Sequence, residues 1–160
     1  MPHLIVIMLL SLLWPVGSSQ PAGDAGAPGL SDSERALKVV LERRDLFLPP
    51  DYALQSQPQR FGEIQVSVKL LGEAQTAAGP RKLVVVQVSA RAQDGQWPQE
   101  LRADWVAYFT PDMQLIERHN QGCGSALRLE GNVIHYGPNR SFDLSTPEGL
   151  AGFKGTQNWC

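Results

Sequence analysis

Between residue 31 and about residue 42, apolar and charged residues repeat with the period of an α-helix. Ser31 and Glu34 stand at the spacing of a capping box, in which each side chain bonds the other residue's backbone N–H. Pro49-Pro50 ends any helix in this region. At 100° per residue the following apolar side chains share one arc: Ala36, Leu37, Val39, Val40, Leu41 and Phe47. The pattern predicts an amphipathic helix whose apolar face covers another layer.

The middle of the chain changes to a period of two, which is typical of half-buried strands. Ile64, Val66 and Val68 alternate with Glu63, Gln65 and Ser67, for example. The connections between these segments are short, and short connections require antiparallel neighbours. The predicted strands cover residues 62–71, 82–92, 101–109 and 113–118. We therefore expect a four-stranded antiparallel meander with the helix packed across its inner face.

The last forty residues read as a second, smaller unit. Residues 127–130 and 133–136 alternate on either side of Gly131-Asn132, a two-residue hairpin signal. A further short strand is expected at 141–144. Thr146-Pro147 then gives an N-cap followed by proline at the first position of a short helix. The predicted fold class is α+β: an N-terminal amphipathic helix packed on an antiparallel β-meander, with a C-terminal β-hairpin and short helix.

The N-terminus has the pattern of an export signal. An apolar run from Leu4 to Trp14 is followed by Pro15 and small residues, with Gly17 and Ser19 at the −3 and −1 positions of a cut before Gln20. The run is short for an uncleaved membrane anchor. We therefore predict a signal peptide at 1–19, a flexible leader at 20–30 and a single α+β domain at 31–160, with no membrane span after cleavage.

Charge and composition indicate which class of partner and which cell compartment to expect. The formal net charge is −2, and a nucleic-acid binder usually carries a basic excess. Arginine outnumbers lysine ten to four, a bias typical of GC-rich bacteria, which favours a periplasmic location. The sequon that begins at Asn139 points instead to animal secretion. The expectation is a periplasmic or secreted protein whose partner is another envelope or extracellular protein, not nucleic acid.

The chain has two cysteines, Cys123 and Cys160. In an exported protein two cysteines are expected to pair with each other. In the chain-entropy description such a bridge stabilises the fold by about 4 kcal/mol. It would also fasten the C-terminal residues, which otherwise fray. We predict an intramolecular disulfide over a redox-active thiol, because neither cysteine has a second cysteine two or three residues away.

Three catalytic or metal-binding arrangements were weighed and not adopted. A site formed by His119, Cys123 and His135 needs a free Cys123 thiolate, which conflicts with the disulfide. A Ser/His/Asp set lacks the G-x-S-x-G elbow. Asp104 and Glu117 are explained as members of a solvated face with cross-strand ion pairs. We assign no catalytic residue, no metal ligand and no cofactor.

Four residues are the candidates for binding: Trp97, Tyr108, His119 and His135. Trp97 and Tyr108 are candidate exposed anchors, because these residue types carry much interface energy. The favoured interpretation of Trp97 is that it folds back over the sheet edge. His135 is expected to be a partly exposed strand residue. The first functional hypothesis is an exported, non-catalytic binding or assembly module. The alternative is a small-molecule-binding, hydrolase or isomerase domain with a pocket between helix and curved sheet.

Overall fold

The computed structural model describes residues 29–122 and 126–156. The signal peptide, most of the leader and both cysteines lie outside these ranges, so the predictions about them remain predictions. The helices are α1 (Asp32–Glu42), α2 (Tyr52–Ser56) and α3 (Pro147–Lys154), with 3-10 turns at Arg44–Leu46 and Pro58–Arg60. The strands are β1 (Phe61–Thr76), β2 (Gly79–Ala92), β3 (Glu100–Phe109), β4 (Leu115–Gly122), β5 (Leu127–Glu130), β6 (Val133–Tyr136) and β7 (Arg140–Asp143).

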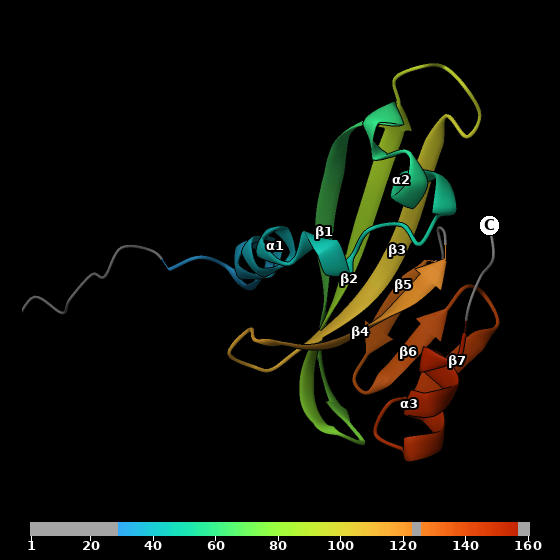
Figure 1. Ribbon diagram of the computed structural model, residues 1–160. Coiled ribbons are helices and arrows are strands. Elements are labelled where there is room, and N and C mark those ends of the chain that lie inside the picture. Colours follow the sequence, from blue (N-terminus) through green and yellow to red (C-terminus); the bar gives the residue numbers. More distant parts are fainter. Residues whose placement is uncertain (1–28, 123–125, 157–160) are drawn as a thin grey trace, which may run out of the picture.

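The predicted α+β architecture is confirmed. Strands β1 to β4 form one antiparallel sheet in sequence order, and β5 to β7 form a second, three-stranded sheet. Helix α1 lies on one side of the large sheet, whereas the small sheet and α3 lie on the other (Figure 1). The large sheet is thus the middle layer, and each of its faces has a different cover.

Local signals at both ends of the domain operate as expected. Ser31 and Glu34 form the capping box of α1, with the Ser31 backbone N–H donating to Glu34 Oε2 at 2.7 Å. Thr146 caps α3 by accepting a 3.0 Å hydrogen bond from the N–H of Gly149, and Pro147 occupies the first turn. Each motif satisfies backbone donors that a helix leaves without partners at its N-terminus.

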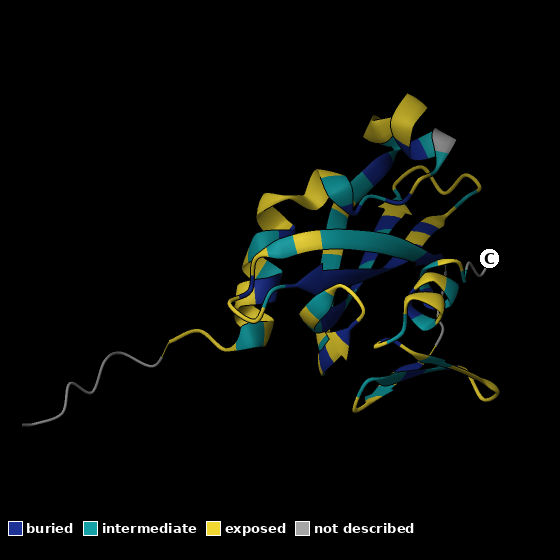
Figure 2. Cartoon of the chain, turned by 90° about the horizontal axis from the view of Figure 1, so that it is seen from below, coloured by how far each residue is buried: buried dark blue, intermediate teal, exposed yellow. Residues whose placement is uncertain are grey.

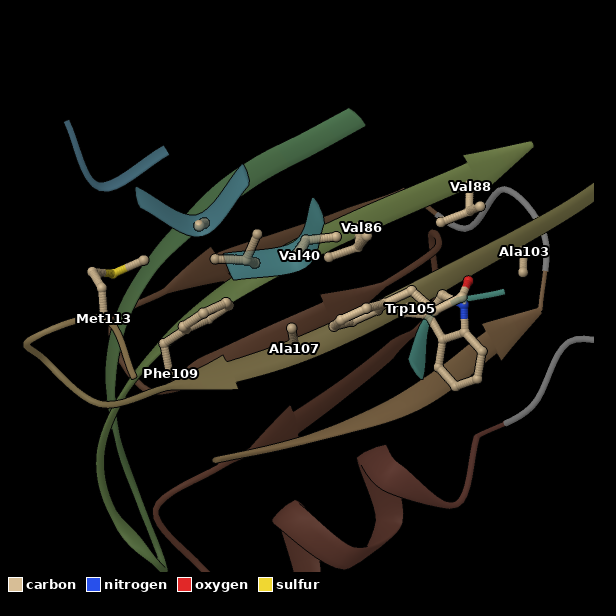
Figure 3. Packing of buried hydrophobic residues seen from close by; sticks show 11 residues of the cluster. Val40, Val86, Val88, Ala103, Trp105, Ala107, Phe109 and Met113 are labelled. Carbon is tan, nitrogen blue, oxygen red and sulfur yellow. The ribbon is translucent and has the colours of Figure 1, made fainter. Parts of the chain in front are cut away.

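The first core fills the space between α1 and the sheet. Val40 from the helix packs toward Val86 and Phe109, and Met113 closes one end of the cluster (Figure 3). Trp105 packs edge-to-face with Phe47 at a centroid distance of 6.2 Å. The two alanines of β3, Ala103 and Ala107, supply small side chains in the same layer, as the alternation predicts.

The second core lies between the sheet and the C-terminal unit. Leu83 of β2 and Tyr108 of β3 pack there with Ile134, Leu144 and Phe153. Two backbone contacts fasten the β1–β2 hairpin to this unit. The N–H of Ala77 donates to the Leu144 carbonyl at 2.7 Å, and that of Gln75 donates to Asn132 Oδ1 at 2.8 Å.

Two-sided covering explains the burial of β3, in which seven consecutive residues, Ala103 to Phe109, are buried. Figure 2 shows buried residues along the inner strands and exposed ones on the outer surface of α1 and in the turns. The structure departs from the expected elements at several points: β2 begins at Gly79 rather than at residue 82, and β4 spans Leu115–Gly122 rather than 113–118. Helix α2 was not predicted, and β1 extends to Thr76 through a bulge at Gly72, whose φ of 143° suits glycine.

Candidate binding surfaces

Trp97 lies in the connection between β2 and β3, at the end of the large sheet opposite the β1–β2 turn (Figure 1). Its side chain is 89% exposed. The expectation that it folds back over the sheet edge is therefore wrong, and the exposed-anchor interpretation describes its placement. Arg60 contacts the backbone of this loop at the Trp97 carbonyl.

Polar contacts fasten this loop. Arg60 Nε donates to Asp94 Oδ2 at 2.8 Å, and its Nη2 lies 3.4 Å from the Trp97 carbonyl. The hydrogen bond from Arg60, helped by one from the Gln96 backbone, holds the pKa of Asp94 below its ordinary value. The N–H of Gln93 donates to the Arg60 carbonyl at 2.8 Å. The loop thus displays Trp97 from a backbone that is fixed at several points.

Tyr108 and His119 lie together, with Tyr108 buried and His119 partly buried. Tyr108 is 1% exposed, so it is not the exposed anchor that was considered. Its side chain lies on the face of β3 that the C-terminal unit covers. The Tyr108 and His119 rings are 5.5 Å apart between centroids, and Phe153 of α3 packs edge-on against His119 at 5.0 Å.

Burial controls the protonation of this pair. Burial, with a smaller contribution from the nearby Lys154 ammonium, lowers the pKa of His119 to about 4. Burial also raises the pKa of the Tyr108 hydroxyl, with the Glu117 carboxylate adding to the rise. At neutral pH the imidazole and the phenol are therefore both uncharged. The imidazole is thus an uncharged, partly buried side chain that packs between two aromatic rings.

Side-chain polar atoms around His119 are incompletely bonded within the described ranges. The Nε2 atom of His119 lies 2.5 Å from Gln121 Nε2. His119 Nδ1, Gln121 Oε1 and the hydroxyl of Tyr108 are buried without a hydrogen-bond partner. No sequence pattern predicts that the amide of Gln121 is buried, because its burial depends on how the C-terminal unit packs on the large sheet.

His135 occupies the opposite side of the C-terminal unit, on the middle strand β6. Its side chain is 31% exposed, which confirms the expected partly exposed strand histidine. Nε2 lies 3.2 Å from Glu130 Oε2, and Glu130 also pairs with Arg128. Of the four candidate binding residues, the structure brings together only Tyr108 and His119.

An open polar groove with a volume of about 460 Å³ lies on the large sheet. Its lining comes from β1, β2 and β3: Gln65, Val66, Ser67, Gln87, Val88, Ser89, Glu100 and Arg102. The alternation of polar side chains such as Gln65 and Ser67 along β1 is the signal in the sequence for this polar surface. The lining offers amide, hydroxyl, carboxylate and guanidinium groups for hydrogen bonds and charge.

Asp104 corrects one expectation. It is 4% exposed, not solvated, and its Oδ2 lies 3.5 Å from Gln87 Nε2. Arg102 Nε approaches its Oδ1 at 3.9 Å. Glu117 pairs instead with Lys154 of α3 at 2.6 Å. The two carboxylates therefore have separate structural partners and do not form an acid–base pair.

Within residues 29–122 and 126–156, no cluster of three or more His, Cys, Asp or Glu side chains is arranged to hold a metal ion. No helix in the same part of the chain is long and apolar enough to cross a membrane. In comparisons with protein families, curated proteins and solved structures, nothing matches this chain. A function for this chain is therefore inferred from its own residues and their contacts.

Proposed function

We propose that this protein is an exported, non-catalytic binding module that recognises another envelope or extracellular protein through the loop that carries Trp97. The observation that carries the proposal is the 89% exposure of a tryptophan on a fastened loop. Tryptophan is among the residues that contribute most to binding when buried at an interface. When a partner covers a large apolar side chain that is exposed to water, the burial of that surface contributes favourable free energy to binding.

The fastening of the loop supports the same role. Binding loses affinity when loops must be ordered at the interface. The contacts of Arg60 with Asp94 and with the Trp97 carbonyl remove part of that cost before the partner arrives. Arg60 and Asp94 are therefore positioning residues, and Trp97 is the contact residue.

The alternative, a ligand pocket between helix and sheet, has less support. The space between α1 and the sheet is occupied by buried side chains such as Val40, Val86 and Phe109. Tyr108, one of the candidate binding residues, lies in the second core on the other side of the sheet, with the His119 ring beside it. The open groove is polar, unlike the largely apolar pockets that bind small molecules.

Site-specific photo-crosslinking tests the proposal. A photoreactive amino acid replaces Trp97 in the full chain, produced in its native host, and a matched chain carries it at Ser145, which is exposed in the turn before α3. We expect a light-dependent adduct with one defined protein from position 97 and none from position 145. A chain that forms no protein adduct at position 97 contradicts the proposal.

The affinity for the crosslinked partner then gives a quantitative readout. Trp97→Ala should weaken binding by about 30-fold or more, the effect of removing an interface residue that dominates the binding energy. Gln99→Ala changes an exposed side chain of the same loop and should leave the affinity unchanged. Equal effects of the two substitutions would contradict the role of the indole.

A further inference from the structure

The C-terminal unit carries a tripeptide that the proposed function does not use. Asn139, Arg140 and Ser141 form an Asn-X-Ser sequence in which the middle residue is not proline. Such a sequence recurs by chance, so its placement in the fold decides whether it is usable. Asn139 lies in the turn between β6 and β7, and Arg140 and Ser141 are the first two residues of β7.

All three residues of the tripeptide are exposed, as are Gly137 and Pro138 before them. Within the described residues, no hydrogen bond or ion pair involves the Asn139 side chain. A large hydrophilic group attached there displaces no packed side chain. The folded state therefore accommodates a modification that requires a surface position.

Strand pairing explains why the tripeptide faces outward. Ser141 is paired with His135, whereas Phe142 is paired with Ile134, a residue of the second core. Successive strand residues point to opposite faces. The Phe142 ring lies against α3, where a Cβ added to Gly152 would be 3.2 Å from it. Ser141 therefore points away from α3 and the core, together with the partly exposed His135.

A second asparagine of the same unit provides the contrast. Asn132, in the β5–β6 turn, is partly buried and its Oδ1 accepts a 2.8 Å hydrogen bond from the Gln75 N–H. It is followed by Val133 and Ile134, so no hydroxyl stands two residues further on. One asparagine of the unit thus has a structural bond, and the other has an exposed amide with the required serine.

We infer that Asn139 is a site of N-linked glycosylation, acquired in a eukaryotic secretory compartment from a lipid-pyrophosphate-linked oligosaccharide. This inference rests on the export that is part of the proposed function. In the transfer, Asn139 Nδ2 forms a bond to C1 of the first sugar and gives up one proton. The bond between C1 and the pyrophosphate oxygen breaks, the lipid pyrophosphate leaves, and nothing is oxidised or reduced. The glycan would project from the end of β6 in the small, three-stranded sheet.

The test uses the intact mass of the full chain, both isolated from its own source and secreted by animal cells, before and after digestion with a glycan-releasing amidase. Released sites are read as Asn-to-Asp conversion at position 139. Three variants accompany the parent chain in the animal cells: Asn139→Gln, Ser141→Ala and Ser141→Thr. Their melting temperatures, measured after amidase treatment, show whether all of them are folded.

We expect a glycan on the parent chain and on Ser141→Thr, which keeps the hydroxyl, and loss of the mass increase in Asn139→Gln and Ser141→Ala. A parent chain that is exported from its own source with Asn139 unmodified overturns the inference and leaves export standing. A chain that stays inside the cell with residues 1–19 attached overturns both the inference and the export. Photo-crosslinking at position 97 in Asn139→Gln reports on partner binding separately.

Discussion

The indole Nε1 of Trp105 donates a 2.8 Å hydrogen bond to the backbone carbonyl of Phe47. This bond connects the middle of β3 to the segment that follows α1. The Phe47 ring of that segment also lies edge-on against the indole ring. Arg118 of β4 completes the arrangement, because its guanidinium stacks over the Trp105 ring at 4.9 Å from the centroid. One side chain of the sheet thus positions the connection after the helix.

Trp105→Phe should lower the free energy of unfolding. The substitution keeps an aromatic ring but leaves the Phe47 carbonyl buried without its donor, which costs about 1–3 kcal/mol, with a further loss of packing. Urea denaturation followed by circular dichroism measures the change. Trp97→Phe is the control, since an exposed side chain should change stability by no more than about 0.5 kcal/mol. Equal stability of Trp105→Phe and the parent chain would contradict the importance of this bond.

Stability should fall in mild acid because of His119. Its pKa is about 4 in the folded protein and has an ordinary value of 6.5, so the unfolded chain binds the proton first. The stabilising contribution is complete above pH 6.5 and is lost as the pH falls toward 4, by about 3 kcal/mol. His119→Phe should lack this part of the pH dependence. If urea denaturation shows the same slope between pH 6.5 and 4 in both proteins, the buried neutral histidine is not its cause.

Lys154 should influence the titration of His119 directly. Burial is the main cause of the lowered pKa, and the Lys154 ammonium is the second. Lys154→Met keeps most of the side-chain stem and removes the charge, so the pKa of His119 should rise while staying below 6.5. Ring-proton NMR measures it. Lys69→Met, at an exposed position of β1, should leave the pKa unchanged, and an equal shift in both variants would point to a general charge effect.

Gly149 should not tolerate a side chain. A Cβ at this position would lie 2.8 Å from both the Asp143 carbonyl carbon and Thr146 Oγ1, which would push α3 away from its own cap. Gly149→Ala is expected to destabilise the fold by about 1–3 kcal/mol, like other overpacked substitutions. Gly152→Ala meets only the Phe142 ring at 3.2 Å, and the helix preference for alanine offsets part of that contact. Thermal unfolding compares the two, and an equal tolerance would contradict the geometry.

The elements that were predicted correctly have local causes. The capping box at Ser31 and the cap at Thr146 are complete within three residues of chain, and the alternation in β1 and β3 follows from the two faces of a strand. Gly131-Asn132 specifies its hairpin in the same way. Such motifs can be recognised without knowing which residues pack against them.

The candidate site was harder to predict because exposure is set by distant contacts. Tyr108 was placed on the correct face of β3, but only the packing of α3 and the small sheet makes that face a core. Asp104 was expected in water for the same reason. Trp97 differs in the opposite direction: its side chain is exposed, and its loop is contacted by Arg60, which is 37 residues away in the chain. Alternation along a strand indicates which face each side chain points to, but it does not indicate whether another part of the chain packs on that face.

The shared middle layer has a consequence for how the molecule comes apart. In β2, Val84 belongs to the first cluster and its neighbour Leu83 to the second, and in β3 Ala107 and Val106 divide in the same way. The two clusters therefore share strands β2 and β3 of the large sheet. Displacing α3 would weaken the support beneath α1, so heat should dismantle the helix face and the hairpin face in a single step.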